Sequence, residues 1–406
     1  MAQCKVQPDM EFIRELQAAG GESLKKCYQC ATCSVACPIS PANNPYPRKE
    51  MIWASWGLKE KLSKDIDLWL CHNCGNCADL CPRGAKPADL MSAARNMVYK
   101  DLTQPSIVGK WMSSAKGLPF LFGIPAILWL VVWWIRAGFN DGNWFPRAAD
   151  GRIVFGQVFY GDYTIDPIFM ITFFGAVFIM YQGVMKLLDL FKPEGKVLML
   201  GKTKPWYLHL IDVLKDEVIT HKKFSDCATG PAAPAAKSDD KECCCTKIAK
   251  IDRKWGHMAL FYSFIILAIV TAIVAGGHWV GKVIPMLKVT TPLAPADPIK
   301  ILANIGALGL LFGLGVLTVR RMKLNPKYQG SSFYDWYLLG IIWLVGVTGI
   351  LSQVFRLLDC VTFAFSVYYL HLVFVWMLFA YLPWSKLGHF VYRTAALTYV
   401  RMVGRS

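Results

Sequence analysis

One cysteine motif occurs twice in the first part of this chain, and it limits how that part can fold. Both copies follow the pattern C-x2-C-x2-C-x3-C-P without a gap. Their cysteines are Cys27, Cys30, Cys33 and Cys37, and Cys71, Cys74, Cys77 and Cys81. Three thiolates this close together can bind three irons of one 4Fe-4S cluster. The fourth, set further along and followed by proline, reaches the other cluster in proteins that hold two.

We therefore expect the ligands to cross between the two copies of the motif. The two predicted ligand sets are Cys27, Cys30, Cys33 with Cys81, and Cys71, Cys74, Cys77 with Cys37. A pair of structural zinc knots is the alternative. Zinc ribbons, however, use paired C-x2-C units separated by a long spacer, not three cysteines in close succession. The motif favours two iron–sulfur clusters.

Composition indicates a membrane protein. The chain has 406 residues, of which 54% are hydrophobic and only 18% charged, which is too apolar for two soluble domains. Six segments are long enough to cross a bilayer, which takes about 20 residues. These segments are 118–137, 167–191, 257–280, 298–319, 334–357 and 361–384. We expect an all-α fold: a small ferredoxin-type two-cluster helical domain followed by a six-span transmembrane helical bundle.

The composition also divides the chain into regions. The expected regions are an iron–sulfur domain at 1–110, spans one and two at 111–192, a cytoplasmic loop at 193–256, a cytochrome b part with spans three to six at 257–392, and a tail at 393–406. Apolar residues at helical spacing predict a surface helix over 206–221 of the loop. A low-complexity linker follows at 228–242. We predict no function for Cys227 or for Cys243–Cys245, because three adjacent cysteines cannot all face one metal.

Charge and flanking residues predict the orientation. The first twenty residues contain no apolar signal segment, so the cysteines are expected in the cytoplasm, where thiolates stay reduced. The loop after the fourth span and the tail after the sixth carry Lys and Arg without acids. Both termini are therefore expected on the cytoplasmic side of the inner membrane. Basic loops also explain the net charge of +16 without a nucleic-acid partner.

Four histidines form a pattern in the predicted spans. His257 and His278 begin and end the third span, while His371 lies in the sixth and His389 just beyond it. Ionisable residues at such depths are costly and usually functional. Spacings of 21 and 18 residues place each pair near one face of a helix. Because the two spans run in opposite directions, we predict an inner haem b bound by His257 with His389, and an outer haem b bound by His278 with His371.

The other polar residues are weaker candidates for a functional site. We expect His72, His209 and His221 to be solvated or interfacial. A quinone enters from lipid, so its site should lie near one haem. The outer-end candidates are Trp279, Lys282, Arg356 and Asp359. The inner end beside Lys386 is the alternative, and ordinary snorkelling at helix ends also explains such charges. The chain has no Walker loop or GxGxxG motif, so it is expected to move electrons rather than convert a soluble substrate.

These residues resemble known families. The segments CYQCATCSVACP and LWLCHNCGNCADLCPRGAKPADLMSAAR resemble the C subunit of heterodisulfide reductase. The C-terminal two-thirds is similar to the cytochrome b subunits of heterodisulfide reductase and respiratory nitrate reductase. The fusion of both parts resembles the C subunit of the quinone-interacting membrane-bound oxidoreductase of sulfate-reducing prokaryotes.

The resemblance implies an electron-transfer subunit. In such a complex, electrons pass between menaquinone and cytoplasmic flavin- and iron–sulfur-containing subunits, with adenylylsulfate reductase as the acceptor. The cofactors implied are two 4Fe-4S clusters, two haems b and menaquinone as substrate. The alternatives are a heterodisulfide reductase-like membrane subunit serving another acceptor, a membrane anchor or redox sensor, and a zinc-stabilised scaffold. Four paired histidines argue against a sensor, which needs no transmembrane haem chain.

Overall fold

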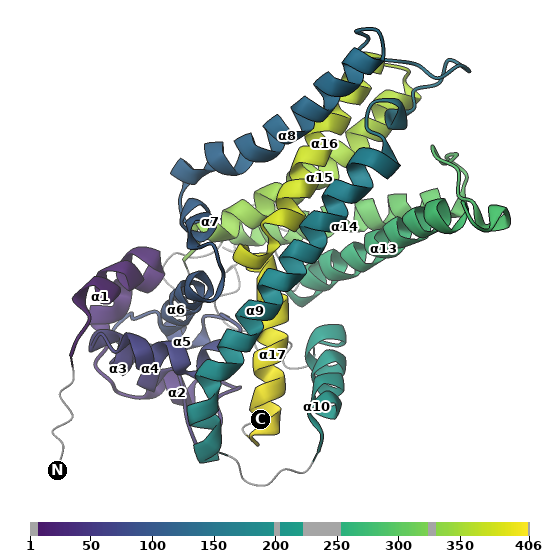
Figure 1. Cartoon of the computed structure of the whole chain (residues 1–406). Coiled ribbons are helices and arrows are strands. Elements are labelled where there is room, and N and C mark those ends of the chain that lie inside the picture. Colours follow the sequence, from purple (N-terminus) through teal and green to yellow (C-terminus); the bar gives the residue numbers. More distant parts are fainter. Residues whose placement is uncertain (1–6, 199–203, 222–252, 324–329, 405–406) are drawn as a thin grey trace, which may run out of the picture.

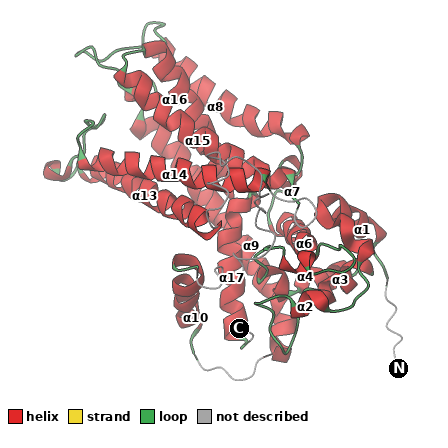
Figure 2. Ribbon diagram, turned by 180° about the vertical axis from the view of Figure 1, so that it is seen from behind, coloured by secondary structure: helices red, strands yellow, loops and turns green. Residues whose placement is uncertain are grey.

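The structure is a computed structural model, which describes residues 7–198, 204–221, 253–323 and 330–404. Every regular element in these ranges is helical, as predicted (Figures 1 and 2). The short helices of the N-terminal region lie together at one end of a bundle of long helices. Cys227, the linker at 228–242 and Cys243–Cys245 fall outside the described residues.

The N-terminal region is built from small helices around a compact core. These are α1 (Met10–Leu16), α2 (Thr32–Val35), α3 (Arg48–Ser55), α4 (Lys59–Lys64), the 3-10 helix η3 (Ile66–Trp69), α5 (Asn76–Asp79), α6 (Pro87–Leu102) and α7 (Ser106–Trp111). Helix α6 begins with a proline, which lacks only an N–H that has no helical partner there. Its buried residues Leu90, Met91, Ala94 and Val98 recur at helical spacing. They pack this helix onto the core.

Six further helices are long and apolar enough to cross a membrane. They are α8 (Leu118–Phe139), α9 (Asp166–Leu198), α13 (Arg253–Val280), α14 (Pro298–Met322), α15 (Phe333–Leu357) and α16 (Val361–Ala380). The six predicted spans are therefore all helices. Helix α9 has 33 residues, more than a bilayer requires. Its later part runs on to the N-terminal region, where Leu187 and Phe191 enter that region's core.

The long helices pack mainly as two hairpins, α13 with α14 and α15 with α16, and α8 and α9 lie against α16. Small residues let the first pair approach closely. A Cβ added at Gly313 of α14 would come 2.7 Å from the backbone nitrogen of Leu260 in α13. A Cβ added at Gly315 would meet nothing within 4 Å. Only one of these two glycines is therefore needed for helix contact.

The chain does not continue as one helix from the sixth span to His389. Helix α16 ends at Ala380, two short 3-10 turns follow, and a new helix, α17 (His389–Met402), begins. Pro383, which lies between the two helices, cannot continue the helical hydrogen bonding. The sixth span thus ends before the predicted residue 384. The prediction that His371 and His389 share a helix face is wrong, because they belong to different helices.

The α-helix predicted over residues 206–221 is shorter than expected. Helix α10 (Trp206–Val213) is followed by a π-helical segment, Leu214–Ile219. The apolar side chains of Tyr207, Leu208 and Ile211 are exposed, whereas Val213 is buried. Helix α10 packs against α17. The predicted boundary between residues 392 and 393 falls inside α17, which is a packed helix.

Helix α17 shares one hydrophobic core with the N-terminal region and α9. Tyr392, Ala396 and Val400 of α17 are buried beside Trp69 and Tyr99. The Tyr392 ring lies 6.3 Å from that of Trp69 and 5.2 Å from that of Tyr99, measured between centroids. This core joins the two halves of the chain.

We expect Gly313→Val to lower the stability of the α13–α14 pair by about 1–3 kcal/mol, because the added side chain must push backbone apart. Thermal unfolding of the full chain in detergent measures this as a lower midpoint. Gly315→Val in the same helix is the matched control and should change the midpoint little. Equal midpoints for the two variants would contradict the close packing.

Candidate functional site

The two cysteine loops repeat in backbone conformation as well as in sequence. In each copy, the second and fourth residues after the first cysteine adopt positive φ. These residues are Gln29 (60°) and Ala31 (67°) in the first copy, and Asn73 (51°) and Gly75 (90°) in the second. A short helix, α2 or α5, follows directly. Left-handed residues in such loops turn successive backbone N–H groups towards one centre. The sequence repeat therefore forms two equivalent cradles.

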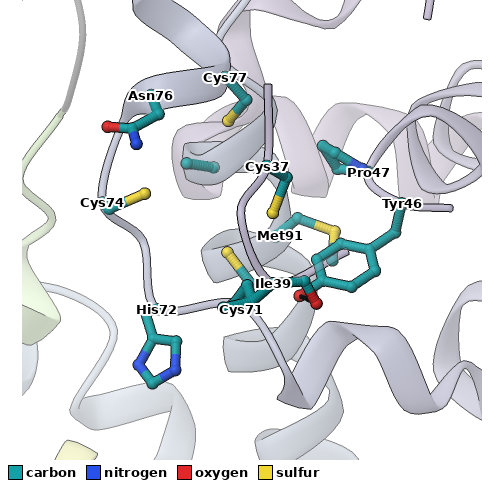
Figure 3. A pocket seen from close by; sticks show the side chains of 11 residues that line it. Cys37, Ile39, Tyr46, Pro47, Cys71, His72, Cys74, Asn76, Cys77 and Met91 are labelled. Atoms are coloured by element: carbon teal, nitrogen blue, oxygen red, sulfur yellow. Dashed lines mark hydrogen bonds between the residues drawn. The ribbon is translucent and has the colours of Figure 1, made fainter. Parts of the chain in front are cut away.

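The second cysteine pocket contains the predicted crossed set. Cys71, Cys74 and Cys77 line it together with Cys37 from the first motif (Figure 3). The Tyr46 ring also lines this pocket. Three sulfurs from one copy and one from the other thus face a common space, which is the donor set that a 4Fe-4S cluster requires.

The first cysteine site lies closer to the surface. The Cys33 thiol is buried near those of Cys27 and Cys30, and Cys30 itself is exposed. Cys81 accepts a hydrogen bond from the backbone N–H of Ala85, with 3.3 Å between nitrogen and sulfur. The membership of Cys81 in this set stays a prediction.

The buried cysteines of the two motifs are poorly suited to act as free reactive thiols. Burial raises the pKa of Cys33 and of Cys37 to about 11, so both are protonated near neutrality without a compensating charge. Thiolates are the form that binds metal, and bound metal deprotonates the thiol. The backbone N–H of Asn73 donates to the Cys71 sulfur at 3.3 Å, which favours the thiolate. The residues present fit iron–sulfur ligation.

Helix α17 contacts the second cysteine pocket directly. The Arg393 guanidinium donates to the Leu70 carbonyl at 3.2 Å and lies 3.0 Å from His72 Nε2. Arg95 donates to the carbonyl of Cys71 at 3.1 Å. Two guanidinium groups therefore bring positive charge to this pocket. His72, predicted to be solvated or interfacial, is a buried contact between the two halves.

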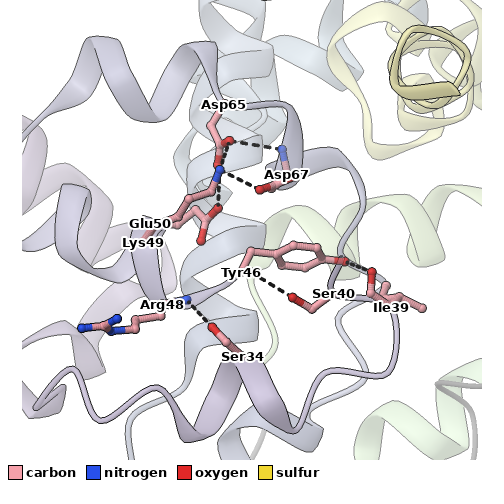
Figure 4. Close-up of polar contacts among 9 residues, drawn as sticks. All are labelled: Ser34, Ile39, Ser40, Tyr46, Arg48, Lys49, Glu50, Asp65 and Asp67. Atoms are coloured by element: carbon pink, nitrogen blue, oxygen red, sulfur yellow. Dashed lines mark hydrogen bonds and ion pairs between the residues drawn. The ribbon is translucent and has the colours of Figure 1, made fainter. Parts of the chain in front are cut away.

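A buried charge cluster lies close to Tyr46 (Figure 4). The Lys49 ammonium is 2.7 Å from Asp67, 3.0 Å from Asp65 and 3.5 Å from Glu50, and all three carboxylates are fully buried. Although burial opposes its charge, Asp65 and Asp67 raise the pKa of Lys49. Burial and the neighbouring Asp65 raise the pKa of Glu50 well above its usual value. Sequence spacing gave no sign of this cluster.

Three of the four candidate haem ligands share one arrangement. His257 Nδ1 lies 3.1 Å from His221 Nε2, and His371 Nδ1 lies 3.1 Å from Thr348 Oγ1. His389 Nδ1 contacts the Lys386 carbonyl. Metal-binding histidines characteristically engage their second nitrogen in this way, which fixes the ring. The residues thus fit ligation through Nε2. His221, predicted to be solvated or interfacial, is buried, whereas His209 is half-buried.

The predicted inner pair, His257 and His389, is linked through aromatic neighbours. Phe261 lies one turn after His257, and Phe390 follows His389; their ring centroids are 6.2 Å apart. At the other end, Phe155 stacks on Tyr368, three residues before His371, with centroids 4.1 Å apart. The loop that carries Phe155 also reaches His278. The histidines His257 and His389 therefore lie near one another at one end of the bundle, whereas His371 lies at the middle of α16 and its pairing with His278 stays a prediction.

His278 differs from the other three histidines. Its Nε2 lies 2.5 Å from Asp162, and Lys282 lies 2.7 Å from the same carboxylate. Trp279 donates to Asp166 at 2.9 Å. The Asp162 and Asp166 contacts, missed by sequence reasoning, place three predicted outer-end residues against the start of α9.

The remaining quinone candidates lie at the α15–α16 turn. Asp359 accepts hydrogen bonds from both terminal nitrogens of Arg147, at 2.6 and 2.9 Å. Arg356 is half-buried and lies within electrostatic reach of Lys300 and Arg152. The four candidates thus form two groups with different partners, and their role in quinone binding stays a prediction.

Comparison with known proteins identifies the N-terminal part. Residues 23–85 match the 4Fe-4S dicluster domain family. The chain is 42% identical over 93 residues to the C subunit of the H(2):CoB-CoM heterodisulfide,ferredoxin reductase of Methanothermobacter marburgensis, covering 23% of this chain and 50% of that protein. It is 38% identical over 78 residues to the iron-sulfur C subunit of the CoB--CoM heterodisulfide reductase of Methanopyrus kandleri, covering 19% and 41%.

A third relative is the C subunit of the ferredoxin:CoB-CoM heterodisulfide reductase of Methanosarcina mazei, 34% identical over 96 residues, with 23% of this chain and 58% of that protein covered. The chain spans about half the length of the curated relatives it matches. No solved structure matches. The N-terminal 4Fe-4S dicluster domain is therefore homologous to the C subunit of heterodisulfide reductase, an iron–sulfur electron-transfer subunit, and in this chain it is joined to six apolar helices.

We expect Glu50→Gln to flatten the pH dependence of stability. Because the folded pKa of Glu50 is raised, its contribution to stability is complete below the unfolded pKa and is lost as pH rises through the folded pKa. The free energy of unfolding should fall by up to about 1.4 kcal/mol per pH unit in that window. Denaturant unfolding of the full chain in detergent from pH 5 to 8 measures the slope. Glu60→Gln, at a side chain that is 89% exposed, is the control. An unchanged slope in Glu50→Gln would contradict the buried protonated carboxyl.

Proposed function

We propose that this chain is the membrane subunit of a respiratory complex that transfers electrons between menaquinone and cytoplasmic flavin- and iron–sulfur-containing subunits. Its cofactors would be two 4Fe-4S clusters and two haems b, which accept and donate single electrons. It would lie in the inner membrane with both termini in the cytoplasm. On the resemblance of the fused chain, adenylylsulfate reductase is the electron acceptor.

One observation carries the proposal: α17 connects the histidine end of the bundle to the second cysteine pocket. His389 begins this helix, and Arg393 lies one turn further on. Arg393 contacts His72 and Leu70, the two neighbours of Cys71. A redox centre held by His257 and His389 would therefore adjoin one held by the second cysteine set. This adjacency supports electron transfer and is not required by an anchor.

The proposed ligands keep their predicted assignments. His257 with His389 would hold the inner haem, and His278 with His371 the outer haem. At His278, the Asp162 carboxylate now contacts Nε2, so this histidine would bind through Nδ1 or turn from Asp162 on haem binding. A quinone headgroup at this end would lie near the polar side chains of Trp279 and Lys282.

The relatives favour a second candidate. Their names describe subunits of heterodisulfide reductases. In this second candidate, the chain is a heterodisulfide reductase-like membrane subunit, and its electron acceptor is not adenylylsulfate reductase. Both candidates require the same cofactors and differ only in the soluble subunits that copurify. Purification from the native membrane and identification of the stoichiometric subunits separates them.

We expect about eight non-haem irons per chain and no zinc, because each of the two 4Fe-4S clusters contains four irons. Cys81→Ser should damage the cluster held by Cys27, Cys30 and Cys33 and spare the other, as seen by electron paramagnetic resonance of the reduced protein. Cys360→Ser, at an exposed cysteine on the α15–α16 turn, should change neither signal. Zinc, or about four irons in all, would contradict the assignment.

We expect two spectrally distinct haems b that quinol reduces. His257→Ala and His389→Ala should remove one and the same haem, and His278→Ala and His371→Ala the other, because each haem b would lose one of its two proposed histidine ligands. Difference spectra of the α-band measure the loss. His209→Ala is the control. Loss of a common haem in His257→Ala and His371→Ala would refute the pairing. Full clusters without quinol-reducible haem would favour the redox sensor.

A further inference from the structure

The two cysteine sites face different surroundings. The second pocket faces α17, through His72 and Arg393. At the first site, Cys30 is exposed, and three apolar side chains beside the cysteines protrude into solvent. They are Val35 (87% exposed), Tyr28 (67%) and Leu80 (54%). Contact between α2 and α5 brings the segments that end in Val35 and Leu80 together. Side chains of this kind are rarely left in water together without a partner.

Basic side chains surround these apolar ones. The Arg83 guanidinium stacks on the Tyr28 ring, 4.0 Å from its centroid, and donates to the Tyr28 hydroxyl at 2.8 Å. Arg48 donates to the carbonyl of Gln29 at 3.1 Å. Both arginines are exposed, and so are Lys25 and Lys26, which immediately precede Cys27. Asp79 is the acid beside Leu80, and it is half-buried.

We propose that this surface, the Tyr28 face (Tyr28, Val35, Leu80, Arg48 and Arg83), docks an acidic redox-protein subunit that exchanges electrons at the first cysteine site. The inference rests on the proposed electron-transfer function. An apolar centre within a charged rim is the usual anatomy of a protein interface, and Tyr and Arg are its commonest energetic anchors. The basic rim selects an acidic partner and speeds its approach.

Charge also excludes the other occupants of such a surface. A second copy of the chain would bring the same basic rim against itself, which like-charge repulsion disfavours. The bilayer would meet the long helices, whereas α2 lies in the helical region at the opposite end from the outer loops (Figure 1). The second cysteine site is not the docking point, because Arg393 and His72 of this chain already contact its loop.

The test uses the full chain in detergent with both clusters loaded, and reduced flavodoxin, an acidic flavoprotein, as the probe. We expect wild-type cluster reduction by flavodoxin to slow as ionic strength rises, because salt screens the attraction. Arg48→Glu with Arg83→Glu should slow it about tenfold or more at low salt. Reduced methyl viologen is a small cation that needs no protein docking. It should reduce the clusters of the double variant without the tenfold slowing seen with flavodoxin.

Two variants separate charge from local structure. Lys25→Glu with Lys26→Glu should also slow the flavodoxin reaction, without touching the hydrogen bonds to Tyr28 and Gln29. Lys61→Glu, on α4, which packs against α3 and α6, is the matched control and should keep the wild-type rate. Wild-type flavodoxin rates in both charge-reversed variants, with intact cluster signals, would overturn the docking face. Absence of clusters from the wild-type protein would instead refute the proposed function.

Discussion

Tyr392 of α17 packs against both Trp69 and Tyr99, which also contact each other, and the relation between the two halves of the chain depends on this cluster of three rings. Aromatic pairs of this geometry contribute about 0.5–1.5 kcal/mol each beyond the area they bury. On the third side, Gly183 of α9 leaves the space that the Tyr392 hydroxyl occupies, and any side chain there would clash with it. Helix α17 is thereby fixed between α9 and the cysteine region, and Arg393 is brought to His72.

Fixed charges around the second pocket follow from the same packing. Arg95 and Arg393 bring positive charge to the loop that carries Cys71, and the Lys49 cluster with its three carboxylates lies close to Tyr46. Positive charge close to an iron–sulfur centre stabilises its reduced form, and buried carboxylates oppose it. Removing Lys49 alone would leave buried carboxylates unpaired, which is strongly destabilising. The balance of positive and negative charge around the second pocket is therefore set by residues from three separate segments.

Local spacing and hydropathy were sufficient to predict the cysteine loops and the six apolar helices. The cysteine motif can be recognised in the sequence because its ligands lie within a few residues of one another. The spans can be recognised because about 20 apolar residues are needed to cross a bilayer. The break before α17 was missed because residues 381–388 remain largely apolar, so hydropathy alone continues the span through Pro383. His72, His221 and the Glu50 cluster were missed because their burial depends on segments far away in sequence. The Asp162 contact with His278 crosses 116 positions, which no local pattern reports.

The central claim is that α17 couples the membrane half to the second cysteine site. Rapid mixing of the full chain with a menaquinol analogue, with haem followed optically and the clusters by freeze-quench paramagnetic resonance, tests it most directly. Arg393→Leu should leave haem reduction unchanged and delay cluster reduction about tenfold or more, because its contact aligns the two sites. Arg401→Leu, on the same helix but paired with Asp216, should retain the wild-type delay. Equal delays in the wild type and Arg393→Leu would contradict the account.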